Sequence, residues 1–453
     1  MERMDILKFG GSSLADFAAM EKCAAIVARN SNPKDVVVSA IADTTRLLVS
    51  LAQQIPMQDK ESLLQELINR HYQIATAVRN SIATKAKLAV LIKRVEELTD
   101  KLTAHKDPKL AAELLALGEQ MSSLLFAAVL HDKGIAATNF DIKKVMKTNT
   151  DFVKAEPDIE KIKQCCHSYL LPICTDQVIV TQGFIGADDE NNTTILGMES
   201  SDYTAALLAE ALGANHFAIW TDVAGIFTLD PKITNKAQPI AELSFREAEE
   251  LAVFGAKILH PRTLQPARRK NISLCVGCSQ NPGTRTLINK NMTENTSNLR
   301  AMSLRKNQIL LTIKNSTNIH MRDFLAKLFN VFAANGIDLD LVTSNNVSAA
   351  IVIDDSQEKL TQESLLTQDL LQQLEIFAQV EIERDLSLIA LVGSHMHKDN
   401  MLKDSLFKFL QANNVRSIYY GVSSHSICFL IASSIAKDIV VQLHDQLFIG
   451  NKK

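Results

Sequence analysis

The sequence has no large excess of charge and no long apolar run. Its 48 lysine and arginine residues nearly balance 51 aspartate and glutamate residues, which leaves a net charge of -3. This balance argues against a general binder of nucleic acid or of membrane surfaces. No run approaches the roughly 18 apolar residues that span a bilayer, and no signal peptide is recognisable before the first predicted strand. We therefore expect a cytoplasmic protein with no nucleic-acid and no membrane partner.

Cysteine is scarce as well. The chain has 7 cysteines in 453 residues, an odd number that fits reduced thiols better than a disulfide framework. Cys275 and Cys278 have the spacing of metal and redox sites, but a structural zinc site needs about four ligands and no second pair lies nearby. The run Cys165-Cys166-His167 is equally incomplete. The sequence therefore predicts no metal-binding cluster made by the protein alone.

Length and composition indicate a globular protein of two or three domains, because 453 residues exceed what one hydrophobic core supports. Up to about residue 290, β-rich runs alternate with helical stretches, which is typical of an α/β domain with a mainly parallel sheet. Residues 59–131 have helical periodicity and predict a helical cluster. Residues 289–298 are rich in asparagine and threonine and predict a linker.

The most informative segment is Lys8-Phe9-Gly10-Gly11-Ser12-Ser13, between a strand-like run and a helical pattern. A lysine and paired glycines at a strand-to-helix turn suit the phosphates of a nucleotide, because backbone N–H groups, a helix N-terminus and a positive charge meet there. An ordinary tight turn is the alternative, since so short a motif also occurs by chance.

Three later segments carry comparable information. Residues 193–213 predict a strand, a turn and a helix that starts with Ser201 or Asp202 as N-cap and ends at Gly213. The other two are residues 219–232, a strand that enters a loop punctuated by glycine and proline, and residues 254–261, a helix end that contains Lys257.

Together these four segments resemble the aspartokinases of the amino-acid kinase family, most closely the monofunctional, lysine-sensitive type. Further matching stretches are residues 37–40, 117–122, 180–186 and 242–245, and the resemblance covers essentially the whole chain in order. It implies an amino-acid kinase catalytic domain over residues 1–290, with a mainly parallel central sheet flanked by helices.

The remaining residues repeat the pattern strand–helix–strand–strand–helix–strand, first in residues 300–385 and then in residues 386–453. This pattern resembles the ferredoxin-like βαββαβ fold of ACT domains. The resemblance implies a tandem pair with one unit partly inserted in the other, an amino-acid effector bound between domains, and a homodimer or homotetramer. A purely structural appendage is the alternative, because folds outlive functions.

The resemblance implies transfer of the γ-phosphoryl group of ATP, with Mg²⁺, to the side-chain carboxylate of L-aspartate. The product, 4-phospho-L-aspartate, would feed the synthesis of lysine, methionine and threonine. Because the carboxylate is already a nucleophile, the reaction requires neutralised phosphate charge and alignment more than a catalytic base.

The resemblance also implies roles for individual residues. Lys8 and Lys257 would place positive charge along the triphosphate, and Asp202 would hold Lys8 or a metal-bound water. Glu119 would pair with the ammonium group of the substrate. The phosphates would accept hydrogen bonds from Gly10, Gly11 and Ser12; the nucleoside would contact Thr221, Asp222, Phe227, Asp230 and Lys232; the substrate would also meet Thr45 and Ser201.

One departure from the family affects the substrate site. Aspartokinases usually carry an arginine followed by small residues where this chain has Met198, Glu199 and Ser200. Methionine cannot replace the two-pronged bond of a guanidinium to the α-carboxylate of the substrate. Loss of such a contact typically costs roughly 2–5 kcal/mol. A weakened aspartokinase, a kinase for another small carboxylate and a catalytically silent nucleotide-binding homologue all remain open.

Arg46 offers a compensation for the missing arginine. It follows Thr45 in a segment where the family tends to have a small polar residue. Our hypothesis is that Arg46 reaches into the pocket and replaces the missing guanidinium. A solvated arginine is the alternative, since arginine is usually exposed.

For feedback control the resemblance implies lysine bound at the first ACT unit, against Phe324, Leu325, Asp340 and Val347. The family generally has serine, glycine and glutamate where this chain has Met321, Asp323 and Asn346. Because a lysine effector needs carboxylates for its ammonium groups and N–H donors for its carboxylate, we expect that lysine binds weakly or that another ligand uses this site.

Overall fold

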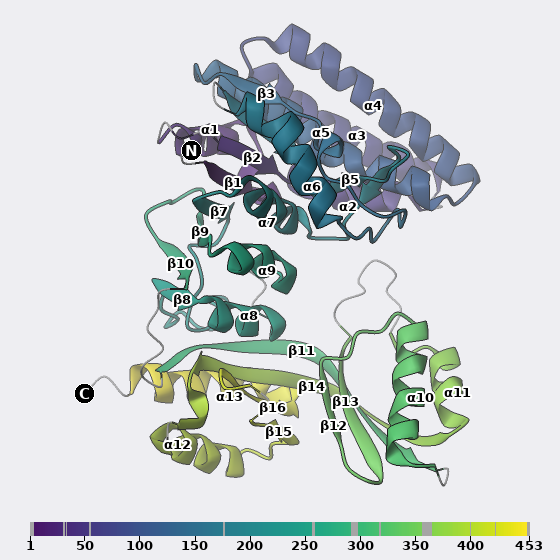
Figure 1. Ribbon diagram of the computed structural model, residues 1–453, viewed down its shortest axis with the longest axis vertical. Coiled ribbons are helices and arrows are strands. Elements are labelled where there is room, and N and C mark those ends of the chain that lie inside the picture. Colours follow the sequence, from purple (N-terminus) through teal and green to yellow (C-terminus); the bar gives the residue numbers. More distant parts are fainter. Residues whose placement is uncertain are drawn as a thin grey trace. The chain divides into compact units, whose positions relative to one another are not determined.

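The computed structural model describes residues 4–29, 32, 34–53, 56–174, 177–255, 259–290, 298–316, 319–355, 365–398, 400–421 and 423–450 (Figure 1). The chain forms two compact units. The first unit contains Met1–Ile226, Pro239–Ala252 and Lys257–Met292; the second contains Phe227–Gln238, Val253–Ala256 and Thr293–Lys453. Two short segments that precede the predicted linker in sequence are thus part of the second unit.

The first unit is built on an eight-stranded sheet with the order β3-β4-β2-β1-β7-β9-β10-β8. All neighbouring strands are parallel except β9 and β10. The central strand β1 (Asp5–Phe9) is buried along its whole length, as a parallel strand covered on both faces requires. The others are β2 (Lys34–Val38), β3 (Ala137–Asn139), β4 (Val178–Gln182), β7 (His216–Thr221), β8 (Glu242–Ser244), β9 (Ser273–Cys278) and β10 (Arg285–Asn289), with a separate hairpin of β5 (Ile185–Ala187) and β6 (Thr193–Ile195). This is the predicted mainly parallel α/β sheet.

Long helices account for the predicted helical cluster of residues 59–131. They are α3 (Met57–Ala77), α4 (Ser81–Ala104) and α5 (Pro108–Asp132). The expectation that no segment could span a membrane needs correction, since α5 is long and apolar enough by length and composition. Within the structure 78% of that apolar window is buried, because α5 packs against α4, β3 and β4 as a core helix. The remaining helices of this unit include α1 (Phe17–Val27), α2 (Thr44–Leu51), α6 (Ile159–Cys165), α7 (Ser201–Leu212), α8 (Phe245–Val253) and α9 (Pro261–Lys270).

The second unit contains a six-stranded antiparallel sheet with the order β12-β13-β11-β14-β16-β15. Its two long strands pair along their length, from Asn298 opposite Ser394 to Asn315 opposite Ala378. Helices packed on this sheet and three apolar clusters complete the described part of the unit. The strands are β11 (Asn298–Asn315), β12 (Leu341–Ser344), β13 (Ser348–Asp354), β14 (Ala378–Ser394), β15 (Ser417–Tyr419) and β16 (Ser426–Ala432), and the helices are α10 (Met321–Ala334), α11 (Gln368–Glu375), α12 (Asn400–Gln411) and α13 (Ser433–His444).

The long strands contribute residues to two separate apolar clusters, each packed with its own helices. The apolar cluster around Phe324 and Leu370 takes Ile309, Leu311 and Ile313 from the second part of β11. The cluster around Leu406 and Val440 takes Met302 from the first part of β11, together with Ile389 and Leu391 of β14. The boundary predicted between residues 385 and 386 therefore falls inside β14, and the predicted domain boundaries stay a prediction. The predicted linker lies mostly outside the described residues.

Candidate active site

The turn after β1 is held by neighbouring segments of the parallel sheet. Gly11 opens a short 3₁₀ helix, η1 (Gly11–Leu14). A Cβ atom at Gly11 would lie 2.5 Å from the carbonyl oxygen of Ala40, so only glycine fits there. The N–H of Gly10 donates to the carbonyl of Trp220 at 2.9 Å. The prediction that Gly10 donates to a phosphate is therefore wrong for this geometry, because the ladder between β1 and β7 continues one residue further.

The N–H groups of Gly11 and Ser12 stay as candidate phosphate donors. Both residues open η1, and the first N–H groups of a helix have no acceptor within it. Gly11 is half-buried and Ser12 is exposed.

Lys8 and Asp202 form the charged centre of the site. The Lys8 Nζ atom lies 2.6 Å from Asp202 Oδ1, and the two side chains are only 10% and 16% exposed. Asp202 is in the first turn of α7, where the helix dipole also favours a negative charge. The structure thus brings together two residues that are 194 positions apart in the printed sequence.

The start of α7 differs from the prediction by one residue. Ser200 is the N-cap position, and its hydroxyl donates to the carbonyl of Gly197 at 2.6 Å instead of capping the helix. Ser201 is buried against Gly183, which has no room for a Cβ atom because Ser201 Cβ would lie 2.5 Å away. This packing fixes Ser201 inside the helix. The predicted end at Gly213 is correct, since Gly213 has a φ of 62°.

Glu119 on α5 is buried and lies close enough to Lys8 for their charges to interact. Burial raises the pKa of Glu119 to about 8. A hydrogen bond from the backbone of Ala40 and the charge of Lys8 act in the opposite direction and lower it. Its Oε2 atom has no hydrogen-bond partner among the residues that the structure describes. A buried oxygen of this kind can accept from a substrate cation.

The position of Thr45 and Arg46 on helix α2 determines how exposed their side chains are. Buried residues Thr44, Leu47, Leu48 and Leu51 form its inner face. Helical periodicity places Arg46 on the opposite face, where its side chain is 75% exposed and pairs with Asp43 at 3.5 Å. Thr45 is half-buried. The structure does not bring Arg46 to Lys8, Glu119 or Asp202, so the hypothesis that it replaces the missing guanidinium is not supported.

The predicted nucleoside residues fall in different units. Thr221 ends β7 in the first unit and Asp222 follows it, and the Thr221 hydroxyl donates to Asp222 Oδ1 at 3.0 Å. Phe227, Asp230 and Lys232 belong to the second unit. Lys257 lies outside the described residues.

Comparison with known proteins assigns the chain to a family. Residues 4–278 match the amino acid kinase family. The chain is 41% identical to lysine-sensitive aspartokinase 3 of Escherichia coli over 448 residues, which cover 99% of this chain and 100% of that protein. This chain belongs to the aspartokinase family. It is also 31% identical to the chloroplastic aspartokinase 3 of Arabidopsis thaliana, over 98% of this chain and 81% of that protein.

Two solved structures resemble this aspartokinase along its length. E. coli aspartokinase III in complex with aspartate and ADP, in the R-state, has a TM-score of 0.91 at 41% identity and covers 98% of this chain and 100% of its own. The same enzyme with lysine and aspartate, in the T-state, has a TM-score of 0.80 at 41% identity and covers 98% and 99%. The predicted family, fold class and enzyme class, an ATP-dependent kinase, are confirmed.

The segment that departs from other aspartokinases is exposed at Met198 and Glu199 and buried at Ser200. Met198 is 43% exposed, and Glu199 adopts a φ of 62°, a conformation that glycine tolerates best. Glu199 and Asp202 raise the pKa of the His260 ring, whereas burial and the charge of Arg262 lower it, with a net downward shift. The charge of Arg262 thus acts on the same imidazole as that of Glu199. His260 and Arg262 are not among the predicted site residues, because the sequence motif in this segment points only to Lys257.

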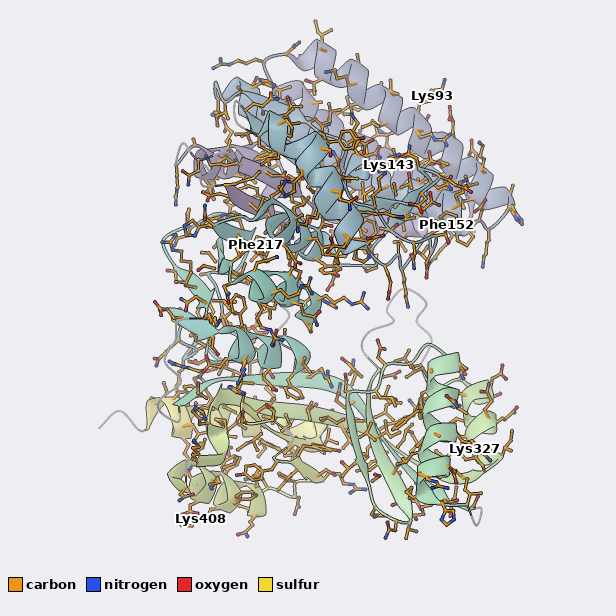
Figure 2. All side chains as sticks on the ribbon, in the orientation of Figure 1. Lys93, Lys143, Phe152, Phe217, Lys327 and Lys408 are labelled. Atoms are coloured by element: carbon orange, nitrogen blue, oxygen red, sulfur yellow. The ribbon has the colours of Figure 1, made fainter. Side chains whose placement is uncertain are left out.

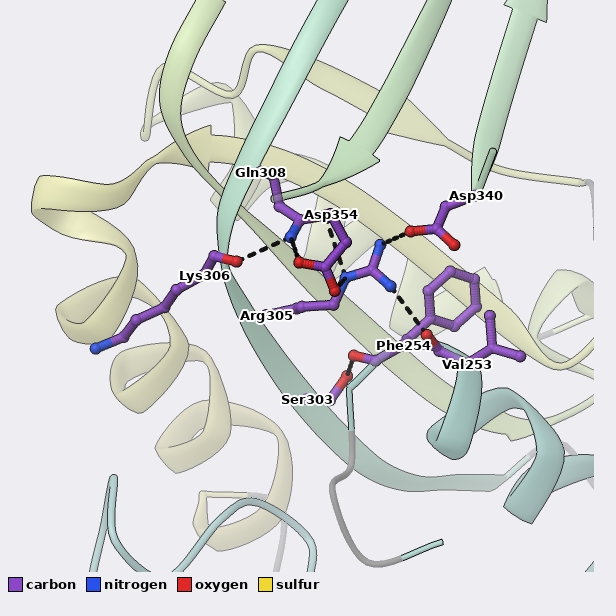
Figure 3. Close-up of polar contacts among 8 residues, drawn as sticks. All are labelled: Val253, Phe254, Ser303, Arg305, Lys306, Gln308, Asp340 and Asp354. Atoms are coloured by element: carbon purple, nitrogen blue, oxygen red, sulfur yellow. Dashed lines mark hydrogen bonds and ion pairs between the residues drawn. The ribbon is translucent and has the colours of Figure 1, made fainter. Parts of the chain in front are cut away.

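The predicted effector residues of this aspartokinase differ in burial and in partners within the second unit. Asp340 pairs with the buried Arg305 at 2.7 Å, and Arg305 also donates to the carbonyl of Val253 and to Gln308, each at 3.1 Å (Figure 3). Burial raises the pKa of Asp340, although Arg305 opposes the shift. Phe324 is a fully buried core residue, Leu325 is half-buried and Val347 is 63% exposed. Asp340 is the predicted effector carboxylate, and it is already paired.

A cavity of about 360 Å³ in the first unit does not contain the charged centre. It is lined by residues of α4, α5 and β6 and by Lys143, whose ammonium donates to Thr193 at 3.4 Å. Figure 2 labels Lys143 and Lys93, the latter on α4. Arg94 in the same cavity is already paired with Glu97 and Glu113. None of the predicted site residues lines it.

Proposed function

We propose that this aspartokinase transfers the γ-phosphoryl group of ATP to the β-carboxylate of L-aspartate, the first step toward lysine, methionine and threonine. The observation that carries the proposal is the pair of Lys8 and Asp202, joined at 2.6 Å, with the buried acid Glu119 in electrostatic range. The complex of E. coli aspartokinase III with aspartate and ADP supports it.

In this mechanism Lys8 neutralises charge on the phosphoryl group as it moves to the acceptor. Asp202 holds the Lys8 ammonium, so the positive charge is oriented before the nucleotide binds. The N–H groups of Gly11 and Ser12 donate to phosphate oxygens, and Lys257 adds a second positive charge. The nucleoside meets Thr221, Asp222, Phe227, Asp230 and Lys232. The carboxylate of aspartate attacks directly and needs no base.

Mg²⁺ fits this set of residues as a partner of ATP. It usually binds through one or two carboxylates plus substrate phosphates and keeps several waters. Asp202 is the carboxylate that fits this role, and the described residues contain no cluster of three or more metal-ligating side chains. Bound Mg²⁺ supplies further charge neutralisation at the phosphates.

The acceptor site is built around Glu119. Its unpartnered Oε2 atom accepts from the ammonium group of aspartate, and Thr45 and Ser201 offer hydroxyl groups. Arg46 has no part in this site because its side chain is 75% exposed.

We further infer that the second unit binds an amino-acid effector and builds a homodimer or homotetramer in the cytoplasm. E. coli aspartokinase III in complex with lysine and aspartate supports lysine as a candidate effector. The pairing of Asp340 with Arg305 supports weak lysine binding, because an effector ammonium has to compete with a guanidinium.

The proposal is tested by incubating the protein with ATP, Mg²⁺, aspartate and hydroxylamine, which converts an acyl phosphate into a coloured hydroxamate. We expect hydroxamate with the wild type and a loss of roughly 100-fold or more in kcat/KM for Lys8→Met. Lys133→Met, which removes a surface lysine paired with Glu21, is the matched control and should keep full activity. If the protein binds ADP but forms no hydroxamate with aspartate or any other acid, it is the catalytically silent homologue.

Transfer to another small carboxylate is the second candidate, and Met198 favours it because no guanidinium is available there for an α-carboxylate. A panel of small amino acids and dicarboxylates in the same assay decides between the two acceptors. If aspartate is the acceptor, Met198→Arg should lower the KM for aspartate by a factor of roughly ten or more. A better acceptor than aspartate in the wild type would move the assignment to the second candidate.

A further inference from the structure

The loop Phe227–Gln238 is built into the core of the second unit. Leu229 is 1% exposed and belongs to the apolar cluster that also contains Met302, Leu406 and Val440. Ile233 packs against the same cluster. The N–H of Met302 on β11 donates to the carbonyl of Thr228 at 2.7 Å. The conformation of this loop is therefore set by the strands and helices of the second unit.

Within the loop, the residues that anchor it to the core differ from the residues that are exposed. Thr228 and Leu229 are buried, whereas Phe227 is half-buried and Asp230 and Lys232 are exposed. Asp230 Oδ1 accepts from the N–H of Lys232 at 2.8 Å, which fixes the turn between them. The side chains that we propose for the nucleoside are thus the ones that the loop leaves free to meet a ligand.

The deepest anchor joins Thr228 to His444, the last residue of α13. The Thr228 hydroxyl lies 2.9 Å from His444 Nε2, and it accepts from the N–H of Gln238 at 2.9 Å. The hydroxyl can accept from this N–H and still donate its own hydrogen. We assign that hydrogen to Nε2, because the tautomer that carries its hydrogen on Nδ1 presents it to the carboxylate of Asp445. The hydrogen on Nδ1 then faces Asp445 Oδ1 at 3.9 Å.

Two further contacts hold the imidazole and the far end of the loop. The His444 ring is fully buried and stacks on Phe448, with ring centres 4.9 Å apart. Lys236 pairs with Asp445, which follows His444 in the chain. The imidazole therefore has one orientation available to it, and the loop is bound at both Thr228 and Lys236.

We propose that His444 is a positioning residue for the nucleotide, acting through Thr228 on the loop that carries Phe227, Asp230 and Lys232. The inference rests on the proposed function of these three residues. Its physical basis is that a buried hydrogen bond connects the end of α13 to Thr228 at the start of the loop, directly beside Phe227. When this bond is lost, the ordered loop becomes a mixture of conformations, and nucleotide binding has to select one of them.

The test uses isosteric and conservative variants of the full-length protein. His444→Phe keeps a ring to stack on Phe448 but removes the acceptor, and Thr228→Val removes the hydroxyl. Each should raise the KM for ATP and the Kd of a fluorescent ADP analogue by about 3–10-fold, the value of one hydrogen bond. The KM for aspartate should stay unchanged. His444→Gln, whose amide oxygen can accept from Thr228, should restore most of the affinity.

Ile351→Val is the control for a purely structural effect, since it thins another apolar cluster of the second unit, which contains no residue of the loop. It should lower thermal stability and leave nucleotide binding unchanged. Wild-type protein that binds no ADP would refute the nucleotide site itself. Wild-type protein that binds ADP no better than His444→Phe and Thr228→Val would overturn the positioning role alone, as would an equal rise of both KM values.

Discussion

At the scale of single residues, Glu119 has the most unusual ionisation in the candidate site. Burial raises its pKa to about 8, so the carboxyl group is mostly protonated near neutral pH in the absence of substrate. Pairing with the ammonium group of aspartate requires the carboxylate. Binding of aspartate should therefore release a proton below pH 8, and affinity should depend on pH.

We predict that the KM for aspartate falls as pH rises from 6 to 8 and then levels off. The change should approach tenfold per pH unit well below the pKa, because each unit increases the carboxylate fraction tenfold. Steady-state kinetics at several pH values measure it, with the KM for ATP as internal control. Glu119→Gln should bind aspartate weakly and without this slope. A wild-type aspartate KM that is constant between pH 6 and 8 would contradict the role of Glu119.

At the scale of elements, α5 positions Glu119 and is fixed at its start by Asp107. The Asp107 carboxylate accepts from the N–H of Lys109 at 2.8 Å and from that of Leu110 at 3.4 Å. Pro108 occupies the first helical position, where its missing N–H costs nothing. These local features alone determine where the helix begins.

We predict that Asp107→Ala lowers the free energy of unfolding of the first unit by about 1 kcal/mol, the usual value of an N-cap. Asp107→Ser keeps an acceptor and should lose much less. Urea unfolding followed by fluorescence reports on this unit, because Trp220 on β7 is the single tryptophan and is 5% exposed. Equal unfolding midpoints for the two variants would argue against the cap.

The long strands show where element prediction fails. Periodicity predicts a strand over residues 309–314, whereas β11 spans Asn298–Asn315. Register shifts interrupt its pairing with β14 between Arg305 and Gln308 and again before Leu310. Such bulges break the alternation of buried and exposed residues, so a period-two pattern identifies only the regular part of the strand.

At the scale of the whole molecule, the proposed regulation by lysine depends on the availability of Asp340. That carboxylate is paired with Arg305, which also holds the carbonyl of Val253 and lies 3.6 Å from Asp354. The turn after Val253 leads directly to the segment of Lys257 in sequence. An effector at Asp340 therefore has to compete with a guanidinium that has several other partners.

We predict that isothermal titration of the wild type gives lysine binding weaker than micromolar. Replacing Asn346 by Glu and Met321 by Ser restores a carboxylate and a hydroxyl that the family generally has, and should tighten binding by roughly tenfold or more. Asp340→Asn in that background should abolish the gain, and threonine and methionine serve as comparison ligands. Micromolar lysine binding by the wild type would refute the prediction.

The sequence by itself determined the family, the alternation of strands and helices, and the charged and glycine-rich turns of the candidate site. These features depend on local chemistry: Gly11 is required where backbone segments nearly touch, and Gly213 ends α7 because its φ is positive. Periodicity also predicted the helices α3 to α5, since each buries one or more faces at regular spacing.

Only the tertiary structure decided which of the candidate residues are available and which partners they have. In the tertiary structure the Gly10 N–H donates to the carbonyl of Trp220, Phe324 lies in the core and Asp340 pairs with Arg305. The tertiary structure also placed Phe227–Gln238 in the second unit, where Thr228 forms a hydrogen bond with His444. The partner of a hydrogen bond across about 200 residues depends on how distant segments pack, and no local pattern in the sequence encodes that choice.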